Sequence, residues 1–232
     1  MNKTSIKAVL FDLDDTLWAI EPVLVLAEQQ LYAWLQQHAP AVTAQHTISS
    51  LRQRRQLLAQ REPAYRINLW ALRHTVLSEV LAECHEDVTL ADPAMELFSR
   101  ARNAVNPFDD VVPGLQSMKS SLKLGTVSNG FADLGVIGLA GHFEVSIAAH
   151  QFGTAKPDPS IFHAACSALD VEPAHTLYVG DDLTLDVLGA QQAGLRAAWM
   201  NRFARELPAE IQPDVVCTNL HELQHWLGLT SV

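Results

Sequence analysis

Two aspartates that directly follow a short apolar run constrain this chain more than any other feature. Residues 6–10 are mostly apolar and β-branched, as expected of a buried parallel strand, and Asp12 and Asp14 come next. If the extended backbone continues, residues two apart project the same way. Two carboxylates at the end of a buried strand repel each other and lose hydration, and a divalent cation would compensate for both effects. The stretch therefore predicts a metal-assisted catalytic site.

Two simpler interpretations of an aspartate-rich segment are a calcium loop and a solvated turn. An EF-hand loop counted from Asp12 needs Gly at its sixth position and Glu at its twelfth, and the chain has Leu17 and Val23 there. A solvated turn does not require an apolar strand before it. The catalytic interpretation is therefore favoured.

Charge and cysteine content restrict the class of protein. The 232 residues carry a net charge of −10, which argues against nucleic acid as the main partner, because phosphate backbones are bound by clustered Lys and Arg. The three cysteines are scattered and form no C-x-x-C pair, which favours a reducing compartment. No signal-like segment or membrane-length apolar run is present. We expect a cytoplasmic protein without a membrane partner.

The predicted secondary structure changes twice along the chain. Residues 21–105 show helical spacing of apolar residues and no convincing strand, whereas strands and helices alternate from residue 113 onward. This predicts an α/β fold, a doubly wound parallel sheet with an inserted all-helical domain. The expected domains are a core of residues 1–17 and 106–232 and a helical insert of residues 18–105. Further strands are expected at 123–127, 144–148, 176–179, 195–200 and 214–217, with helices at 115–122, 132–139, 159–169 and 186–193.

Three more polar segments follow predicted strands or begin predicted helices. Ser128 and Asn129 end a strand in a glycine-terminated loop, where a hydroxyl and backbone N–H groups suit phosphate oxygens. Lys156 precedes Asp158-Pro159, a typical helix start. A lysine buried among carboxylates should keep its proton.

The last polar segment, Gly180-Asp181-Asp182-Leu183-Thr184-Leu185-Asp186, lies past an apolar strand, where open α/β sheets bind ligands. Asp182 has two possible roles, in the site or as the cap of the following helix.

Together these four segments resemble the motifs of the haloacid dehalogenase-like (HAD) hydrolase superfamily, and they spread over residues 12–186. The resemblance implies a HAD core with a helical cap over the active site, and phosphatase activity through an aspartyl-phosphate. It assigns Asp12 as nucleophile and Asp14 as general acid and base, a group that the carbon–halogen-cleaving relatives lack. By the same resemblance the remaining roles are phosphate binding by Ser128, Asn129 and Lys156, Mg²⁺ binding by Asp12, the Asp14 backbone carbonyl and Asp181, and support by Thr16 and Asp186.

A closer resemblance concerns the substrate. The stretches 11–23, 68–73 and 180–190 are similar to bacterial HAD phosphatases that act on flavin mononucleotide and on the phosphorylated ribitylaminouracil precursor of riboflavin. This implies a small phosphorylated metabolite of riboflavin metabolism as substrate. The alternatives are a phosphatase for a sugar phosphate or nucleotide, and a non-catalytic HAD-fold binding protein.

Two features of the sequence have simpler interpretations than a binding site. His221-Glu222-Leu223-Gln224-His225 spells the zinc-protease pattern H-E-x-x-H, but no third ligand follows it, so we interpret it as a surface helix. Six arginines with a single acid lie between residues 52 and 73, and a solvated helix face is favoured over anion attraction. Trp34, Tyr65 and Trp70 are candidates for stacking on a substrate ring, although such residues more often belong to a core.

Overall fold

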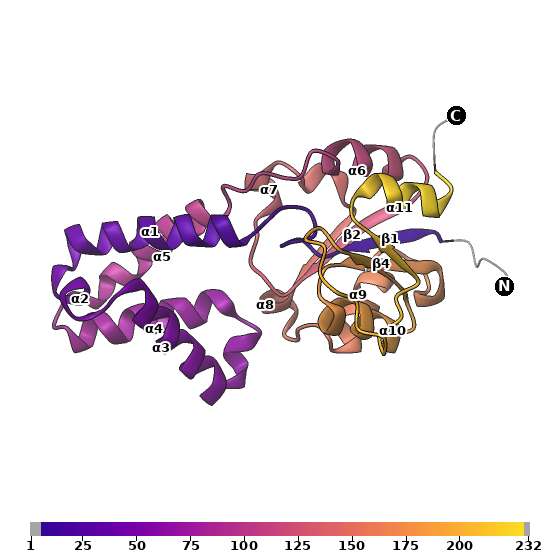
Figure 1. The fold of residues 1–232 in the computed structure, drawn as a ribbon. Coiled ribbons are helices and arrows are strands. Elements are labelled where there is room, and N and C mark those ends of the chain that lie inside the picture. The colour runs from indigo at the N-terminus through magenta and orange to yellow at the C-terminus, as the bar shows by residue number, and fades with distance from the viewer. Residues whose placement is uncertain (1–5, 230–232) are drawn as a thin grey trace. The chain divides into compact units, whose positions relative to one another are not determined.

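The computed structural model describes residues 6–229, which form two compact units (Figure 1). One unit contains the sheet and comprises residues 6–19, 106–130 and 134–229. The other is helical and comprises residues 20–105 together with residues 131–133. Phe131 belongs to the helical unit because its ring packs against Phe98, and the Asp133 backbone N–H donates to Asn103.

The sheet has six parallel strands in the order β3-β2-β1-β4-β5-β6. The strands are β1 (Ala8–Phe11), β2 (Lys123–Ser128), β3 (Val145–Ala148), β4 (Thr176–Gly180), β5 (Arg196–Met200) and β6 (Val215–Cys217). Sheets of this kind need helices on both faces because both faces are apolar. The helices of this unit are α6 (Val111–Lys119), α7 (Leu134–Ile137), α8 (Ala149–Phe152), α9 (Pro159–Ala168), α10 (Gly189–Gln192) and α11 (Leu220–Leu227). In Figure 1, α6 and α11 lie on one side of the sheet, and α9 and α10 lie on the other.

The first strand, β1, occupies the centre of the sheet. All four of its residues are fully buried, and Phe11 pairs with Thr126 on one side and Val179 on the other. From β1 the chain builds outward to β2 and β3, and later to β4, β5 and β6 on the opposite side. The strand order therefore reverses beside β1, and ligands bind open α/β sheets at such a point, outside the carboxyl ends of the strands.

The helical unit is built from five α-helices: α1 (Glu21–His38), α2 (Pro40–Gln45), α3 (Ile48–Arg61), α4 (Leu69–Glu83) and α5 (Ala91–Arg102). Apolar residues at helical spacing form its core, with Leu31 and Leu35 of α1 packed among residues of α4 and α5 such as Val80 and Phe98. Leu69 has the helical spacing of these core residues, but it is 39% exposed because it stands at the first position of α4.

The predicted fold class is confirmed, and the strands lie within two residues of their predicted bounds. Two helices differ from their predictions. The helix expected at 115–122 is α6, which begins four residues earlier, at Val111, and ends at Lys119. The segment expected as a helix over 186–193 begins as a π-helix at Leu183–Leu188 and continues as α10. The Asp182 carbonyl accepts from the backbone N–H groups of both Asp186 and Val187, which produces the wider turn. Gly194 ends the segment in the left-handed conformation, at φ +82°, which glycine adopts without strain.

Among the residues that the structure describes, no helix combines the length and apolar composition needed to cross a bilayer.

Candidate active site

The carboxyl ends of β1, β2 and β4 bring the predicted residues together. The Asp12 backbone N–H donates to the Val179 carbonyl at 2.8 Å, so Asp12 directly follows the pairing of β1 with β4. Ser128 is the last residue of β2, and Asp181 follows β4. Parallel strands end at the same edge of a sheet, and this edge therefore collects polar side chains that lie far apart in sequence.

Lys156 is the centre of the buried polar cluster. Its ammonium donates to Asp12 Oδ1 at 2.6 Å, to Asp186 Oδ1 at 2.7 Å and to the Tyr178 hydroxyl at 2.8 Å. Since an ammonium has three N–H donors, all of them have a partner. The Lys156 side chain is only 3% exposed, and Asp186 is similarly buried. The geometry therefore fixes both carboxylates around one positive charge.

Burial and charge act in opposite directions on this cluster. Burial raises the pKa of Asp12 well above its usual range, and Lys156 opposes that shift while Asp186 adds to it. Burial alone would lower the pKa of Lys156, but Asp12 and Asp186 raise it well above its usual value. The lysine therefore keeps its proton, as predicted from the sequence. An additional positive charge beside Asp12 would favour the ionised carboxylate.

A group of three carboxylates could hold a cation. Side-chain oxygens of Asp12, Asp181 and Asp186 all lie within 4.8 Å of one another. Burial raises the pKa of Asp181 to about 6, an effect that Arg205 opposes and Asp186 reinforces. Arg205 reaches Asp181 from the loop after β5 and donates to its Oδ2 at 2.8 Å and to its carbonyl at 2.9 Å.

Asp14 is placed differently from Asp12. β1 ends at Phe11, and Asp14 forms an isolated bridge with Trp18. The Asp14 Oδ1 accepts from the indole N–H of the fully buried Trp18 at 2.8 Å. The Asp14 side chain is not part of the group formed by Asp12, Asp181 and Asp186. This does not conflict with the prediction, because Asp14 was expected to bind the metal through its backbone carbonyl. Thr16, which follows in the same turn, has its hydroxyl 3.4 Å from Asp12 Oδ2.

The segment after β2 holds the lysine segment in place. Asn129 makes two hydrogen bonds to the backbone of Lys156: its Oδ1 accepts from the Lys156 N–H at 2.8 Å, and its Nδ2 donates to the Lys156 carbonyl at 3.0 Å. The Ser128 hydroxyl accepts from the Gly130 N–H at 3.0 Å. The Asn129 side chain therefore positions Lys156, which the sequence did not indicate.

Residues 6–194 match the sequence model of a protein family, the haloacid dehalogenase-like hydrolases. The chain is a haloacid dehalogenase-like hydrolase. This family match covers all four polar segments, and it agrees with the position of their residues at the carboxyl edge of the parallel sheet.

Named relatives narrow the activity of this HAD hydrolase. It is 29% identical to the 5-amino-6-(5-phospho-D-ribitylamino)uracil phosphatase YigB of Escherichia coli, over 84% of this chain and 83% of the relative. It is 33% identical to the phosphoserine phosphatase of Thermus thermophilus, over 66% of this chain and 65% of the relative. Both relatives are phosphatases, and this HAD hydrolase is a phosphatase.

A solved structure extends the comparison. The crystal structure of a 2-haloacid dehalogenase from Pseudomonas syringae pv. Tomato is 36% identical and superposes with a TM-score of 0.90, over 96% of this chain and 98% of that one. The likeness in fold does not distinguish dehalogenase from phosphatase chemistry, because one fold supports several reactions.

Several contacts of the HAD site were not anticipated from the sequence. The Tyr178 hydroxyl accepts from Lys156 and donates to the Val127 carbonyl at 2.8 Å, so it links β4 to β2 across the central strand. Tyr178 has the spacing of a core strand residue, and only its hydroxyl indicates a polar partner. Arg205 lies beyond all four segments, and no pattern in the sequence connects it with Asp181.

The structure gives a role to Asp182, which the sequence left with two possibilities, and to its neighbour Gly180. Asp182 caps the π-helix, because its side chain accepts from the N–H groups of Thr184 and Leu185 at 2.8 Å. Gly180 lies against Asp186: a Cβ at Gly180 would be 2.2 Å from Asp186 Oδ2. A side chain at position 180 is thus incompatible with the position of Asp186.

The H-E-x-x-H pattern lies on α11. His221 and His225 are exposed, and the Glu222 carboxylate accepts from the Thr218 backbone N–H at 2.7 Å and from its hydroxyl at 3.0 Å. Glu222 therefore stabilises the start of the helix. That role accounts for the glutamate without a metal.

Proposed function

We propose that this HAD phosphatase is a magnesium-dependent phosphomonoester hydrolase that acts through an aspartyl-phosphate on a small phosphorylated metabolite. The observation that carries the proposal is the buried cluster of Asp12, Lys156 and Asp186 beside Asp181, at the carboxyl edge of the sheet. A non-catalytic binding protein would have no need to bury two carboxylates beside a third at one edge.

The donor set fits Mg²⁺, a hard cation that prefers carboxylate oxygens. Asp186 uses one oxygen for Lys156 and the other for the Asp182 N–H, so its oxygens are already occupied. Asp12 and Asp181 would hold the metal, and Asp186 would orient Lys156. Bound magnesium supplies positive charge that neutralises the carboxylates and the phosphoryl oxygens.

The residues of this chain then divide the reaction between them. An ionised Asp12 oxygen attacks phosphorus while the bond to the leaving oxygen breaks, and Asp14 gives its proton to that oxygen. Water next attacks the phosphorus of the aspartyl-phosphate, Asp14 takes its proton, and inorganic phosphate and Asp12 are released. The Ser128 hydroxyl and N–H groups of the loop at Asn129 would hold the phosphoryl oxygens, and the charge of Lys156, whose N–H groups are occupied by Asp12, Asp186 and Tyr178, would attract them.

Asp14→Asn tests the acid–base role. We expect a loss of about 10²- to 10⁴-fold in kcat on an alkyl phosphate, because the departing alkoxide needs a proton, and a clearly smaller loss on p-nitrophenyl phosphate, whose phenol leaves without one. Steady-state kinetics on both substrates measure the difference. Asp15→Asn, which changes the neighbouring carboxylate, is the control and should show no dependence on the leaving group. Equal losses of Asp14→Asn on both substrates contradict the assignment.

The substrate we propose is flavin mononucleotide or the phosphorylated ribitylaminouracil precursor of riboflavin. Similarity to YigB over most of both chains supports it, as do the stretches described from the sequence. Trp70 offers an aromatic face, since it is 37% exposed and stacks on His74 at 5.1 Å instead of lying in the core. A stacking contact of this kind contributes about 0.5–1.5 kcal/mol, which biases selection without determining it.

A panel of phosphorylated metabolites tests the substrate, with purified protein assayed for phosphate release with and without Mg²⁺. We expect kcat/KM to be higher on flavin mononucleotide or the ribitylaminouracil phosphate than on hexose phosphates, nucleotides or phosphoserine, and activity to require Mg²⁺. Asp12→Asn measured in parallel excludes a contaminating phosphatase. Equal or higher efficiency on a hexose phosphate or phosphoserine discards the flavin-pathway substrate and leaves the general phosphatase. Activity that survives removal of divalent metal discards magnesium.

A further inference from the structure

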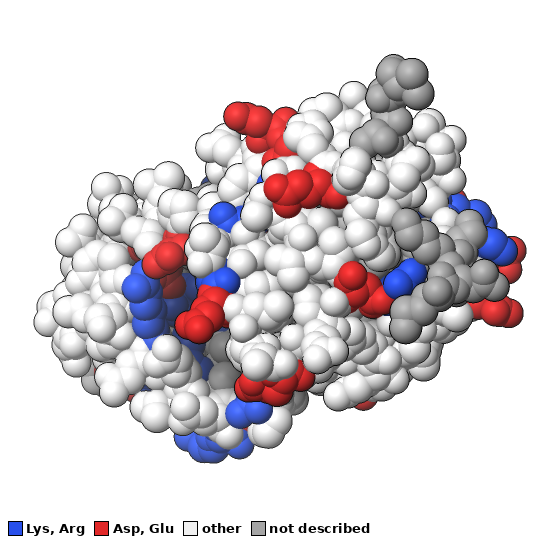
Figure 2. All heavy atoms as spheres, turned by 45° about the vertical axis from the view of Figure 1, so that its right-hand side comes forward, with Lys and Arg blue, Asp and Glu red and all other residues white. Residues whose placement is uncertain are grey.

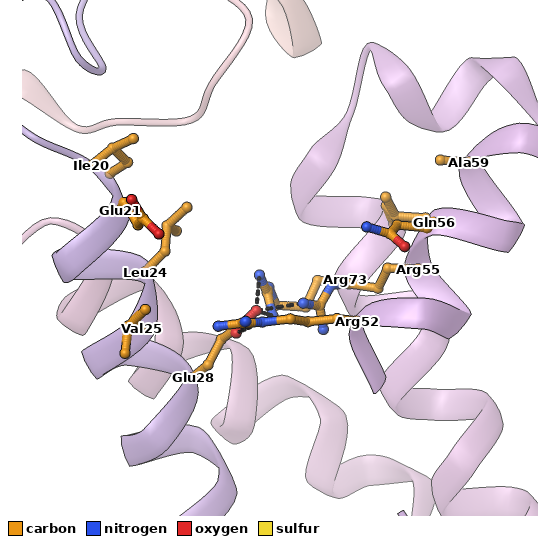
Figure 3. A pocket seen from close by; sticks show the side chains of 11 residues that line it. Ile20, Glu21, Leu24, Val25, Glu28, Arg52, Arg55, Gln56, Ala59 and Arg73 are labelled. Carbon is orange, nitrogen blue, oxygen red and sulfur yellow. Dashed lines mark hydrogen bonds and ion pairs between the residues drawn. The ribbon is translucent and has the colours of Figure 1, made fainter. Parts of the chain in front are cut away.

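Three arginines in the helical unit converge on one carboxylate. Arg52 and Arg55 of α3 and Arg73 of α4 all contact Glu28 of α1. Arg73 contributes two N–H groups at 3.3 Å to Glu28 Oε1, which also accepts from Arg55, and Arg52 donates to Oε2. Figure 3 shows the three guanidinium groups gathered around Glu28. The solvated helix face expected from the sequence therefore does not describe Arg55 and Arg73, whose side chains are 14% and 11% exposed.

The other arginines of this segment have ordinary surface roles. Arg54, on the same helix as Arg52 and Arg55, pairs with Glu83 at 2.5 Å, and Arg61 pairs with Glu62 at 3.3 Å. On the part of the molecule seen at the left of Figure 2, basic side chains lie beside acidic ones. Arg66 donates to the Ala59 carbonyl at 3.3 Å. In the cluster at Glu28, by contrast, three arginines share one carboxylate.

The cluster at Glu28 has more positive charge than it needs for stability. The Glu28 side chain is 7% exposed, those of Arg55 and Arg73 are 14% and 11% exposed, and a single arginine would neutralise Glu28. Burial and the neighbouring charge of Arg55 lower the pKa of Arg73 to about 9, and burial also lowers the pKa of Arg55. Like charges held together out of water cost stability, and groups that are perturbed in this way gather at functional sites.

The surplus charge faces a cavity. A pocket of about 470 Å³ is bounded by α1, α3 and α4, with the guanidinium groups at its base (Figure 3). Its titratable lining consists of the three arginines together with Glu21 and Glu28, which leaves a net charge of +1 at neutral pH. The remaining walls are mostly apolar: Ile20, Leu24, Val25, Gln56, Ala59 and Leu72. The volume falls within the usual range for small-molecule sites, roughly 300–1,000 Å³.

Chemistry and shape together define the class of ligand. A planar guanidinium binds a carboxylate through two parallel N–H groups, and arginine is the usual residue where an anion of this shape is recognised. One net positive charge matches a monoanion better than a dianionic phosphate. The apolar walls match a hydrocarbon body attached to that anion.

We propose that this pocket binds a small carboxylate with an apolar body, at Arg52, Arg55 and Arg73. The site lies entirely within the helical unit and is separate from the residues to which the phosphatase chemistry is assigned. The proposal does not rest on the identity of the phosphatase substrate, and it gives the helical unit a ligand of its own.

Binding of phenylacetate to the full chain tests the proposal, with phenylacetamide as its uncharged counterpart. We expect saturable binding of phenylacetate by titration calorimetry or ligand-observed NMR, with phenylacetamide bound at least about tenfold more weakly because it lacks the charge. Arg52→Gln and Arg55→Gln should each weaken phenylacetate binding at least about tenfold. Arg54→Gln, one residue away and paired with Glu83, is the matched control and should bind like wild type.

Glu28→Gln should change the affinity for phenylacetate in the opposite direction to the arginine variants. Removing the carboxylate that competes for the guanidinium groups should strengthen phenylacetate binding, whereas a merely structural cluster would show no gain. Arg52 has a side chain that is 47% exposed, so Arg52→Gln keeps the test valid if Arg55→Gln fails to fold. No saturable binding by wild type, or equal affinity in wild type and Arg52→Gln, overturns the proposal.

Discussion

Replacing Asp12 with Asn is expected to lower kcat by at least about 10³-fold, which is a rise of about 4 kcal/mol in the barrier. An amide oxygen does not form the aspartyl-phosphate under the same conditions, because it lacks the charge of the carboxylate. The fold should survive, since the Asn Oδ1 still accepts from Lys156 and Asp186 keeps its ion pair with the lysine. Phosphate release from p-nitrophenyl phosphate measures the loss.

Two controls separate a lost nucleophile from a damaged site. Thermal unfolding should show that Asp12→Asn remains folded at the assay temperature. Asp182→Asn is a matched aspartate variant on the neighbouring loop that keeps the oxygen that caps the π-helix, and it should retain activity close to wild type. Turnover of Asp12→Asn within about tenfold of wild type contradicts the assignment of Asp12 as nucleophile.

Lys156→Met should have the largest effect on stability. It removes the positive partner of two buried carboxylates, Asp12 and Asp186, and breaking a buried ion pair in this way costs about 3–5 kcal/mol. Chemical denaturation of the metal-free protein measures the loss, and activity should fall with it. In the double variant Lys156→Met/Asp186→Asn, part of the stability should return without the activity, because one unpaired charge is gone. Full stability of Lys156→Met contradicts the assigned role of the lysine.

The stability lost in Lys156→Met should depend on pH. Burial already raises the pKa of Asp12, and without Lys156 nothing in the cluster opposes that shift. An acid whose pKa is higher in the folded than in the unfolded state binds more protons when folded, so stability falls as pH rises between the two values. The gap in unfolding free energy between wild type and Lys156→Met should therefore widen from acidic toward neutral pH. If the gap narrows instead, the raised pKa of Asp12 is not the cause of the pH dependence.

How far the sequence anticipates this site depends on whether a residue belongs to a local pattern. Asp12, Lys156, Asp181 and Asp186 lie next to strand ends and a helix start, and the common edge of a parallel sheet brings such positions together. The fold class is predicted from the alternation of strands and helices after residue 113. Helix capping by Asp182 also depends on neighbours in sequence, so it was among the alternatives that the pattern offered.

The remaining contacts depend on packing between distant segments. Arg205 reaches Asp181 from 24 residues away, and the convergence of α1, α3 and α4 brings Arg73 to Glu28 across 45 residues. Nothing in a run of arginines tells which of its members turns inward, because the charge itself favours water. The side chain of Asn129 holds the Lys156 backbone, a contact that the sequence does not indicate, and phosphate binding at Asn129 stays a prediction.

The central position of β1 has a consequence for synthesis of the chain. β1 is made first, but its two neighbours, β2 and β4, are complete only at residues 128 and 180. At the usual rate of translation the apolar strand waits on the order of ten seconds for its second partner. During this time the helical unit, whose contacts lie mostly within residues 20–105, has its whole sequence available. Nascent chains that have emerged from the ribosome to a point between residues 105 and 122 should therefore contain a folded helical unit together with an unpaired strand, which is the species most exposed to aggregation and to chaperones.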